Sequence, residues 1–173
     1  EKKMNLEDLI DENGLQQDEW SLSRPTFGET GQLEVVGWSG KRKYNKIYIV
    51  KCQVCSQDSE LFGQGHFKTM KGSLVGGQVP CGCAKNPRWS IQQYETRCSR
   101  KAKELGYTFL GFDGVWCGKK TKVTMFCERH GKWSSGIIDD LVNTGCGCPK
   151  CADEKCGKLK TKNDQTMIKS FFA

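Results

Sequence analysis

The spacing of the cysteines constrains the fold of this chain more than any other feature. Cys127 and His130 are separated by two residues, and so are Cys148 and Cys151. Two such pairs, one following the other along the chain, are typical of a tetrahedral zinc site. We therefore predict that these four residues bind one Zn²⁺. The alternative is a set of free cysteines that pack as small apolar side chains. Cys146 competes with Cys148 for the third ligand position.

A second possible metal site lies in the first half of the chain. Cys52 and Cys55 form a C-x2-C pair, and Cys81 and Cys83 follow as a C-x-C pair. C-x-C is a less common second half of a zinc site than C-x2-C. The four thiolates would fill a structural zinc shell, so we expect His66 to be a surface or hairpin residue and not a ligand.

The composition favours metal-stapled modules over one large core. Only 36% of the 173 residues are hydrophobic, while there are 20 glycines and 11 cysteines. Modules with a thin core usually need a metal or disulfide staple, and the paired cysteines favour metal in a reducing compartment. No apolar run is long enough for a membrane span and no signal peptide is visible. We expect no membrane partner and a cytoplasmic protein.

The order of hydrophobic, turn and helix signals predicts an α+β protein of two tandem zinc modules. Strands are expected at 33–38 and 47–50 around a basic turn at 39–43, and the clearest helix is expected at about 88–105. The predicted division is an acidic N-terminal helix within 1–19 (helical over 4–15), a first zinc module at 20–87, a connecting helix at 88–106, a second zinc module at 107–156 and a basic tail at 157–173. The tail is expected to include helical turns at 166–172. Its final Phe171-Phe172 suggests that the natural chain continues.

The second half of the chain repeats the first. The segment 37–42 (Gly-Trp-Ser-Gly-Lys-Arg) corresponds to 115–120 (Val-Trp-Cys-Gly-Lys-Lys), and each is followed by a strand and then by a Cys-x2-Cys/His pair. Repetition of this kind indicates an internal duplication. Cys117 corresponds to Ser39, so we predict that it is not a ligand. Cys98 falls on the apolar face of the expected helix, so we predict that it is a core residue.

The charge distribution indicates a polyanionic partner. Residues 1–30 contain eight acids and three bases, a net charge of −5, whereas the rest of the chain carries +12. A basic body favours nucleic acid, although ordinary solubility charge is the alternative. Trp38 and Trp116 are expected to be core anchors, the alternative being stacking on unpaired bases. The predicted nucleic-acid contacts are Lys41, Arg42, Lys43, Arg97, Arg100, Lys101, Lys119, Lys120 and Lys132.

Both halves resemble known families. The stretch from Thr121 through Cys127, His130-Gly131 and Trp133 to Gly147-Cys148-Pro149-Lys150-Cys151 is similar to a short zinc-binding domain of phages and giant viruses. That domain accompanies homing-type or repair-type endonucleases. The first half, from Tyr48 through the four cysteines to Trp89, resembles the CapR homology domains of tailed-phage proteins. The resemblance implies treble-clef-like or ribbon-like zinc modules that bind nucleic acid. The first half departs from the usual C-P-x-C ending.

No catalytic constellation is visible in the sequence. Each predicted zinc site has four protein ligands, and neither H-E-x-x-H nor the zinc-deaminase pattern is present. We therefore predict a non-catalytic protein with two Zn²⁺ that binds nucleic acid, DNA rather than RNA. Nuclease activity is the alternative for an enzyme. The chain could instead be a phage factor that binds and modulates a host protein, or the DNA-targeting domain of a nuclease.

Overall fold

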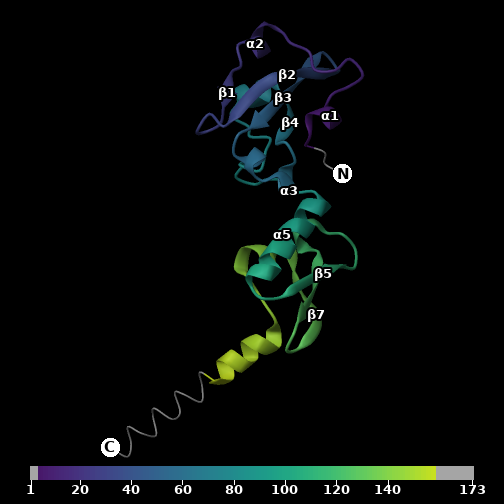
Figure 1. Cartoon of the computed structure of the whole chain (residues 1–173), viewed down its shortest axis with the longest axis vertical. Helices are drawn as coiled ribbons and strands as arrows, with labels where there is room; N and C mark the ends of the chain where they lie inside the picture. Colours follow the sequence, from purple (N-terminus) through teal and green to yellow (C-terminus); the bar gives the residue numbers. More distant parts are fainter. Residues whose placement is uncertain (1–3, 159–173) are drawn as a thin grey trace, which may run out of the picture. The chain divides into compact units, whose positions relative to one another are not determined.

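The computed structural model describes residues 4–158, and the chain divides into two compact units, Glu1–Ser90 and Ile91–Ala173 (Figure 1). The helical tail turns predicted at 166–172 lie outside the described residues. The first unit contains α1 (Leu6–Leu9), α2 (Glu19–Leu22), β1 (Thr26–Phe27), β2 (Leu33–Arg42), β3 (Asn45–Cys52), η1 (Cys55–Gln57), α3 (Ser59–Phe62), β4 (His66–Met70) and α4 (Lys71–Val75). The second contains α5 (Ile91–Glu104), β5 (Thr108–Asp113), η2 (Gly118–Lys120), β6 (Lys122–Cys127), β7 (Gly131–Ile137) and η3 (Asp140–Thr144), followed by a helical segment at 149–158.

The first unit is built on a four-stranded antiparallel sheet in the order β1-β2-β3-β4. Side chains alternate between the two faces of a strand, and β2 accordingly alternates between buried and partly buried positions. Leu33, Val35 and Val50 are fully buried. The core also receives Phe62 from α3 and Phe67 from β4. This core lies beside the cysteines that end β3, so the sheet and the first cysteine cluster support each other.

The second unit packs α5 on a three-stranded antiparallel sheet in the order β5-β6-β7. Cys98 and Ala102 of α5 are fully buried against Val123 and Met125 of β6. The prediction that Cys98 is a core residue is therefore confirmed. The helix predicted as a connector at about 88–105 begins at Ile91 and supplies one side of this core.

The helix predicted for residues 4–15 is confined to Leu6–Leu9. Asn5 makes no side-chain cap there, because its side-chain oxygen accepts a hydrogen bond from the Gln64 amide instead. Ile10 is already extended, and the Gln16 backbone pairs with Trp38 of β2. Asp11, which the predicted helix would include, donates its backbone amide to the Ser39 hydroxyl of β2, a bond that a longer helix would have to give up.

The predicted α+β class is confirmed: the described part of the chain has two sheets and few helices, and the two cysteine clusters lie in separate units. The same order of elements recurs in both units. β3, β4 and α4 correspond to β6, β7 and η3, although the connection between β3 and β4 also contains η1 and α3. Leu74 and Leu141 occupy matching places and are each 2% exposed. Within residues 4–158, the structure contains no helix with the length and apolar character that crossing a membrane requires.

Candidate metal centres and basic surfaces

The second cluster is formed where a hairpin turn faces the start of a helix. β6 ends at Cys127 and β7 begins at Gly131, so the tight turn between them carries His130. Gly131 has φ of +77°, a conformation that glycine adopts without a steric penalty. The helical segment 149–158 begins just after Cys148, whose carbonyl accepts the first-turn hydrogen bond from Ala152. This start places Cys148 and Cys151 on the side that faces the turn.

The ligand atoms of the second cluster converge as a tetrahedral metal requires. The Nδ1 atom of His130 lies 3.7 Å from the Sγ atom of Cys127, 3.5 Å from that of Cys148 and 3.2 Å from that of Cys151. The Sγ atoms of Cys127 and Cys151 are 3.7 Å apart. Zn–S bonds of about 2.3 Å in a tetrahedron put neighbouring sulfurs about 3.8 Å apart. The four residues therefore fit one metal ion without rearrangement.

Cys146, the competitor for the third ligand position, lies exposed and outside this cluster. Gly147 separates it from Cys148 and lies directly against the ring of Tyr107. A Cβ atom at this glycine would come within 2.5 Å of the ring. Burial raises the pKa of Tyr107, whose hydroxyl also interacts with the Cys148 backbone and the Cys151 side chain. The close packing of Gly147 on Tyr107 therefore positions Cys148, and not Cys146, toward the cluster.

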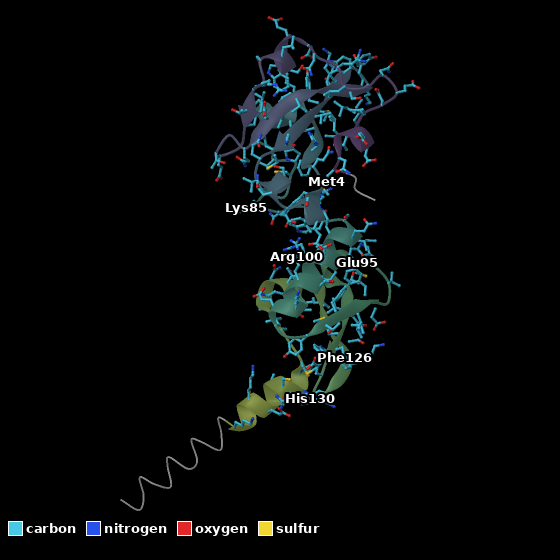
Figure 2. The ribbon with its side chains drawn as sticks, viewed as in Figure 1. Met4, Lys85, Glu95, Arg100, Phe126 and His130 are labelled. Carbon is cyan, nitrogen blue, oxygen red and sulfur yellow. The ribbon has the colours of Figure 1, made fainter. Side chains whose placement is uncertain are left out.

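Glu154 orients the imidazole of the second cluster, a role the sequence analysis missed. The Nε2 atom of His130, a residue labelled in Figure 2, lies 2.9 Å from a carboxylate oxygen of Glu154, so the Nδ1 atom is left to face the sulfurs. Arg129 also pairs with this carboxylate. The hydrogen bond that His130 donates to Glu154 raises the pKa of His130. Burial raises the pKa of Cys127, but hydrogen bonds from the Arg129 and His130 amides outweigh it and lower the pKa to about 7.

Replacing Glu154 with alanine is expected to weaken metal binding at the second cluster by about 10- to 100-fold, because carboxylates that orient a metal-binding histidine typically have effects of this size. Competition with a chromophoric chelator measures the affinity. Asp153→Ala is the matched control, because this neighbouring carboxylate is exposed. An equal loss in both variants would contradict an orienting role for Glu154.

The first cluster forms at the end of β3. Cys52 is the last residue of β3, and Cys55 begins η1, so the turn between them supplies two thiols. The Sγ atom of Cys83 lies 3.7 Å from that of Cys52 and 3.8 Å from that of Cys55. Cys81 completes a group whose four sulfurs all lie within 4.8 Å of one another. These spacings also match the edge of a zinc–thiolate tetrahedron.

Gly82 lets the C-x-C pair fit beneath an aromatic side chain. A Cβ atom at this position would lie 2.4 Å from the Cζ atom of Phe62 and 3.4 Å from the Sγ atom of Cys55. A hydrogen bond from Cys81 lowers the pKa of Cys55 to about 6. The crowded thiols thus favour one thiolate, the form in which cysteine binds metal. All eleven cysteines lie within the described residues, and each is free of a disulfide.

The prediction for His66 is wrong about exposure. His66 begins β4 opposite Lys51 and is only 8% exposed, and its backbone amide donates to Met4. Its Nδ1 atom has no hydrogen-bond partner among the described residues. Burial, and then the charge of Lys51, lowers the pKa of this histidine. It lies outside the four-sulfur cluster, as expected for a residue that is not a ligand.

The basic turn of the first unit is an exposed hairpin tip. Lys41, Arg42 and Lys43 are all exposed where β2 turns into β3, and Lys43 has φ of +57°. Tyr44 follows them and is 97% exposed, a feature the sequence analysis missed. We call residues 41–46 the hairpin tip. Trp38 packs against the core, as expected of an anchor, and the Lys46 amine lies 4.7 Å from its ring centre.

The corresponding residues of the second unit are arranged differently. Trp116 lies in the connection between β5 and β6, is 37% exposed, and packs on Tyr94 and Phe112. Lys119 and Lys120 lie in η2, and the Lys119 amine is 3.6 Å from Asp139. The remaining bases predicted to bind nucleic acid are Arg97, Arg100 and Lys101 on α5 and the exposed Lys132 on β7. Lys101 forms an ion pair with Glu104. The bases predicted to bind nucleic acid therefore lie on different elements of the two units, and the sequence repeat does not give them the same structural setting.

Comparison with known proteins finds a different protein family for each half of the chain. Residues 19–84 match the CapR homology domain, and residues 87–152 match a family described as a protein of unknown function (DUF723). Each half of the chain matches a family of its own. The resemblance to a cysteine-rich phage protein of the CapR homology type is thereby confirmed. The first cysteine cluster lies in the CapR-matching half and the second in the DUF723-matching half.

A phage protein is similar over much of the chain. An Escherichia phage T5 protein with the name "Putative endonuclease" is 31% identical over 126 residues, which cover 69% of this chain and 46% of that protein. The chain therefore spans less than half the length of this relative. No solved structure matches the chain.

Proposed function

We propose that this chain is a non-catalytic nucleic-acid-binding protein, DNA being the preferred partner, whose two units are each stapled by one Zn²⁺. The observation that carries the binding proposal is the hairpin tip, where exposed bases and an exposed tyrosine gather on one turn. Lysine and arginine neutralise phosphates and release the counterions around them. The similarity to a phage protein named as an endonuclease supports a role connected with nucleic acid.

Zinc is the metal that suits the two clusters best. One offers four thiols and the other three thiols with an imidazole, and tetrahedral sites of this type are typical of zinc. Four protein ligands leave no open position for a catalytic water. A hairpin turn facing a helix start supports a treble-clef-like assignment for the second unit. The first unit, whose C-x-C pair lies in a turn before α5, is closer to a ribbon.

Binding through the hairpin tip is tested by its dependence on salt. The double substitution Lys41→Gln with Arg42→Gln is expected to weaken binding to every sequence alike. It should also reduce the slope of log affinity against log salt by about 0.7–0.9 for each phosphate that is no longer neutralised. Fluorescence anisotropy with labelled DNA and RNA, single- and double-stranded, measures both effects.

Lys68→Gln is the control for this test, because Lys68 is exposed on β4 and outside the hairpin tip. An unchanged slope in the double variant would contradict phosphate contact at the tip. If the unaltered protein binds no nucleic acid even at low salt, the proposed function fails, and the alternative of a host-protein partner gains support.

The name of the T5 relative favours a second candidate, namely that the chain is the DNA-targeting part of a nuclease. Cleavage of plasmid DNA with and without Mg²⁺ tests this candidate. We expect no cleavage by the present chain. Cleavage that depends on Mg²⁺ would overturn the non-catalytic proposal.

A further inference from the structure

We propose that the hairpin tip and an adjoining pocket form a binding site for single-stranded nucleic acid, in which Tyr44 stacks on an unpaired base and Lys71 contacts a phosphate. This inference rests on the proposed function and deepens it, since it assigns the site and the strandedness of the ligand.

The geometry of the turn explains why Tyr44 lies in solvent. Arg42 and Asn45 are paired across β2 and β3, so Lys43 and Tyr44 alone make the connection. With Lys43 in a left-handed conformation, this tight turn carries the Tyr44 ring beyond the end of the sheet. A tyrosine ring buries a large apolar area when it can. At 97% exposure it contributes almost nothing to the core, so folding does not explain it.

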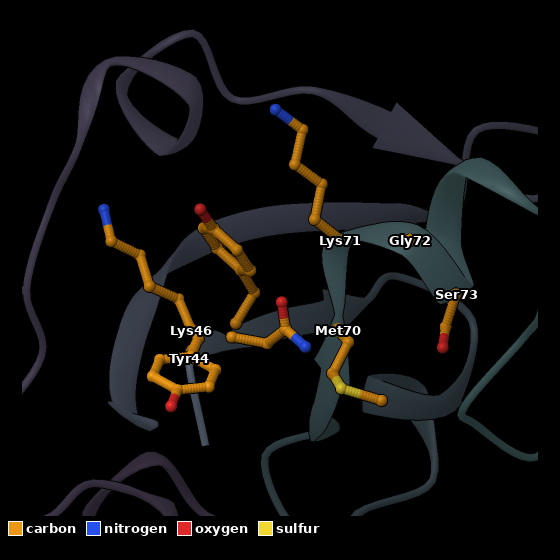
Figure 3. Close-up of a pocket in the computed structure, with 8 residues that line it drawn as sticks. Tyr44, Lys46, Met70, Lys71, Gly72 and Ser73 are labelled. Atoms are coloured by element: carbon orange, nitrogen blue, oxygen red, sulfur yellow. The ribbon is translucent and has the colours of Figure 1, made fainter. Parts of the chain in front are cut away.

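A pocket of about 420 Å³ lies beside the exposed tyrosine (Figure 3). Its volume falls within the range of small-molecule sites, about 300–1,000 Å³. β3 and β4 are paired at Ile47 and Met70, so the start of β3 and the junction of β4 with α4 meet here. The lining residues are Tyr44, Asn45, Lys46, Tyr48, Met70, Lys71, Gly72 and Ser73. They combine apolar and aromatic surface with hydroxyl and amide groups, which suits a nucleotide.

The charges of the pocket favour an anion. Its lining includes two lysines and no acid, and in Figure 3 the side chains of Lys46 and Lys71 extend toward the same side of the ribbon. The Lys46 amine is held 2.6 Å from Asp18, so most of its charge is already compensated. The Lys71 amine lies 4.7 Å from the ring centre of Trp20, and among residues 4–158 no carboxylate pairs with it. Lys71 is therefore the better phosphate contact.

The combination of an exposed ring with lysines indicates a single strand. In a duplex the base faces are stacked on one another and only their edges are accessible in the grooves. An unpaired base exposes its face, which stacks on an aromatic side chain regardless of sequence. Lysines beside the ring can contact the phosphates of the same strand. A ring and a cation at one pocket thus match the repeat of base and phosphate along a single strand.

The test measures binding of the full, zinc-loaded chain to a labelled oligothymidylate, an oligouridylate and a DNA duplex of equal length. Tyr44→Ala is expected to weaken single-strand binding about 5- to 150-fold, since base stacking on one aromatic ring is worth about 1–3 kcal/mol. Tyr44→Phe should retain the affinity, because the ring remains. Lys71→Gln should weaken binding and reduce its salt dependence, whereas Lys68→Gln should not. The two single-stranded ligands show whether DNA or RNA is preferred.

Duplex binding should be unchanged by Tyr44→Ala. Equal weakening of duplex and single strand, or no effect on the single strand while the unaltered protein binds it, would overturn this inference and leave the proposed function intact. Absence of binding to all three ligands at low salt would overturn both. Zinc content and melting temperature should be unaltered in the Tyr44 variants, because Tyr44 lies outside the core.

Discussion

Replacing Cys148 with serine is expected to reduce bound zinc from two ions per chain to one. The Cys148 side chain is 3% exposed and supplies one of four atoms that converge at the second cluster. Serine lacks the thiolate that zinc prefers, and binding by the remaining three ligands is much weaker. Because metal binding and folding are coupled in small modules, we expect β6, β7 and the helical segment 149–158 to lose protection from hydrogen exchange.

Cys146→Ser is the matched control, because Cys146 lies only two residues away but is exposed and outside the cluster. It should keep two zinc ions, as measured by elemental analysis of the purified protein. Loss of one ion from the Cys146 variant, with retention in the Cys148 variant, would reverse our ligand assignment. Chelation of the unaltered protein should release both ions and expose both clusters.

Gly82→Ala is expected to have the next largest effect, because it places a methyl group between two cysteines of the first cluster. The new Cβ atom would lie 2.4 Å from the Phe62 ring. Phe62 packs against Phe67 and Trp89, so its ring has little room to move. Overpacking of this kind typically costs about 1–3 kcal/mol of stability. The displacement also moves the neighbouring thiols, so we expect zinc affinity at the first cluster to fall about tenfold or more.

The control for this substitution is Gly72→Ala. Gly72 lies in α4, and a Cβ atom there would meet nothing within 4 Å. Its variant should melt at the same temperature as the unaltered protein or slightly higher, because alanine favours helix more than glycine does. Thermal unfolding followed by circular dichroism, with a chelator titration, compares the two variants. Equal melting temperatures and zinc affinities for both would contradict the packing argument.

The cysteine clusters could be predicted from the sequence because zinc knuckles depend on local spacing. A C-x2-C or C-x2-H turn places two ligand atoms together whatever the rest of the chain does. The repeat at 37–42 and 115–120 similarly predicted that each unit would have the same order of strand, turn and strand. Zinc as the bound metal and nucleic acid as the partner remain predictions.

Other features depended on contacts between distant residues. The helix predicted for residues 4–15 ends early, and the backbone amide of Asp11 donates to the Ser39 hydroxyl of β2 instead, a contact that local helix signals do not report. Glu154 is 24 residues from His130 in the sequence. Its carboxylate lies near the imidazole only because the helical segment 149–158 faces the hairpin turn. His66 resembled a surface histidine in a glycine-rich stretch, but the pairing of β4 with β3 buried it.

The sequence by itself determined that this chain would form two cysteine-stapled α+β units with basic turns, because these properties follow from residue types at short spacing. Only the tertiary structure showed that Cys148, and not Cys146, lies in the second cluster, with Gly147 between them packed on Tyr107. Only the tertiary structure also showed the exposed Tyr44 and its pocket. Exposure depends on which elements cover a residue, and that is the outcome of packing between strands far apart in the chain.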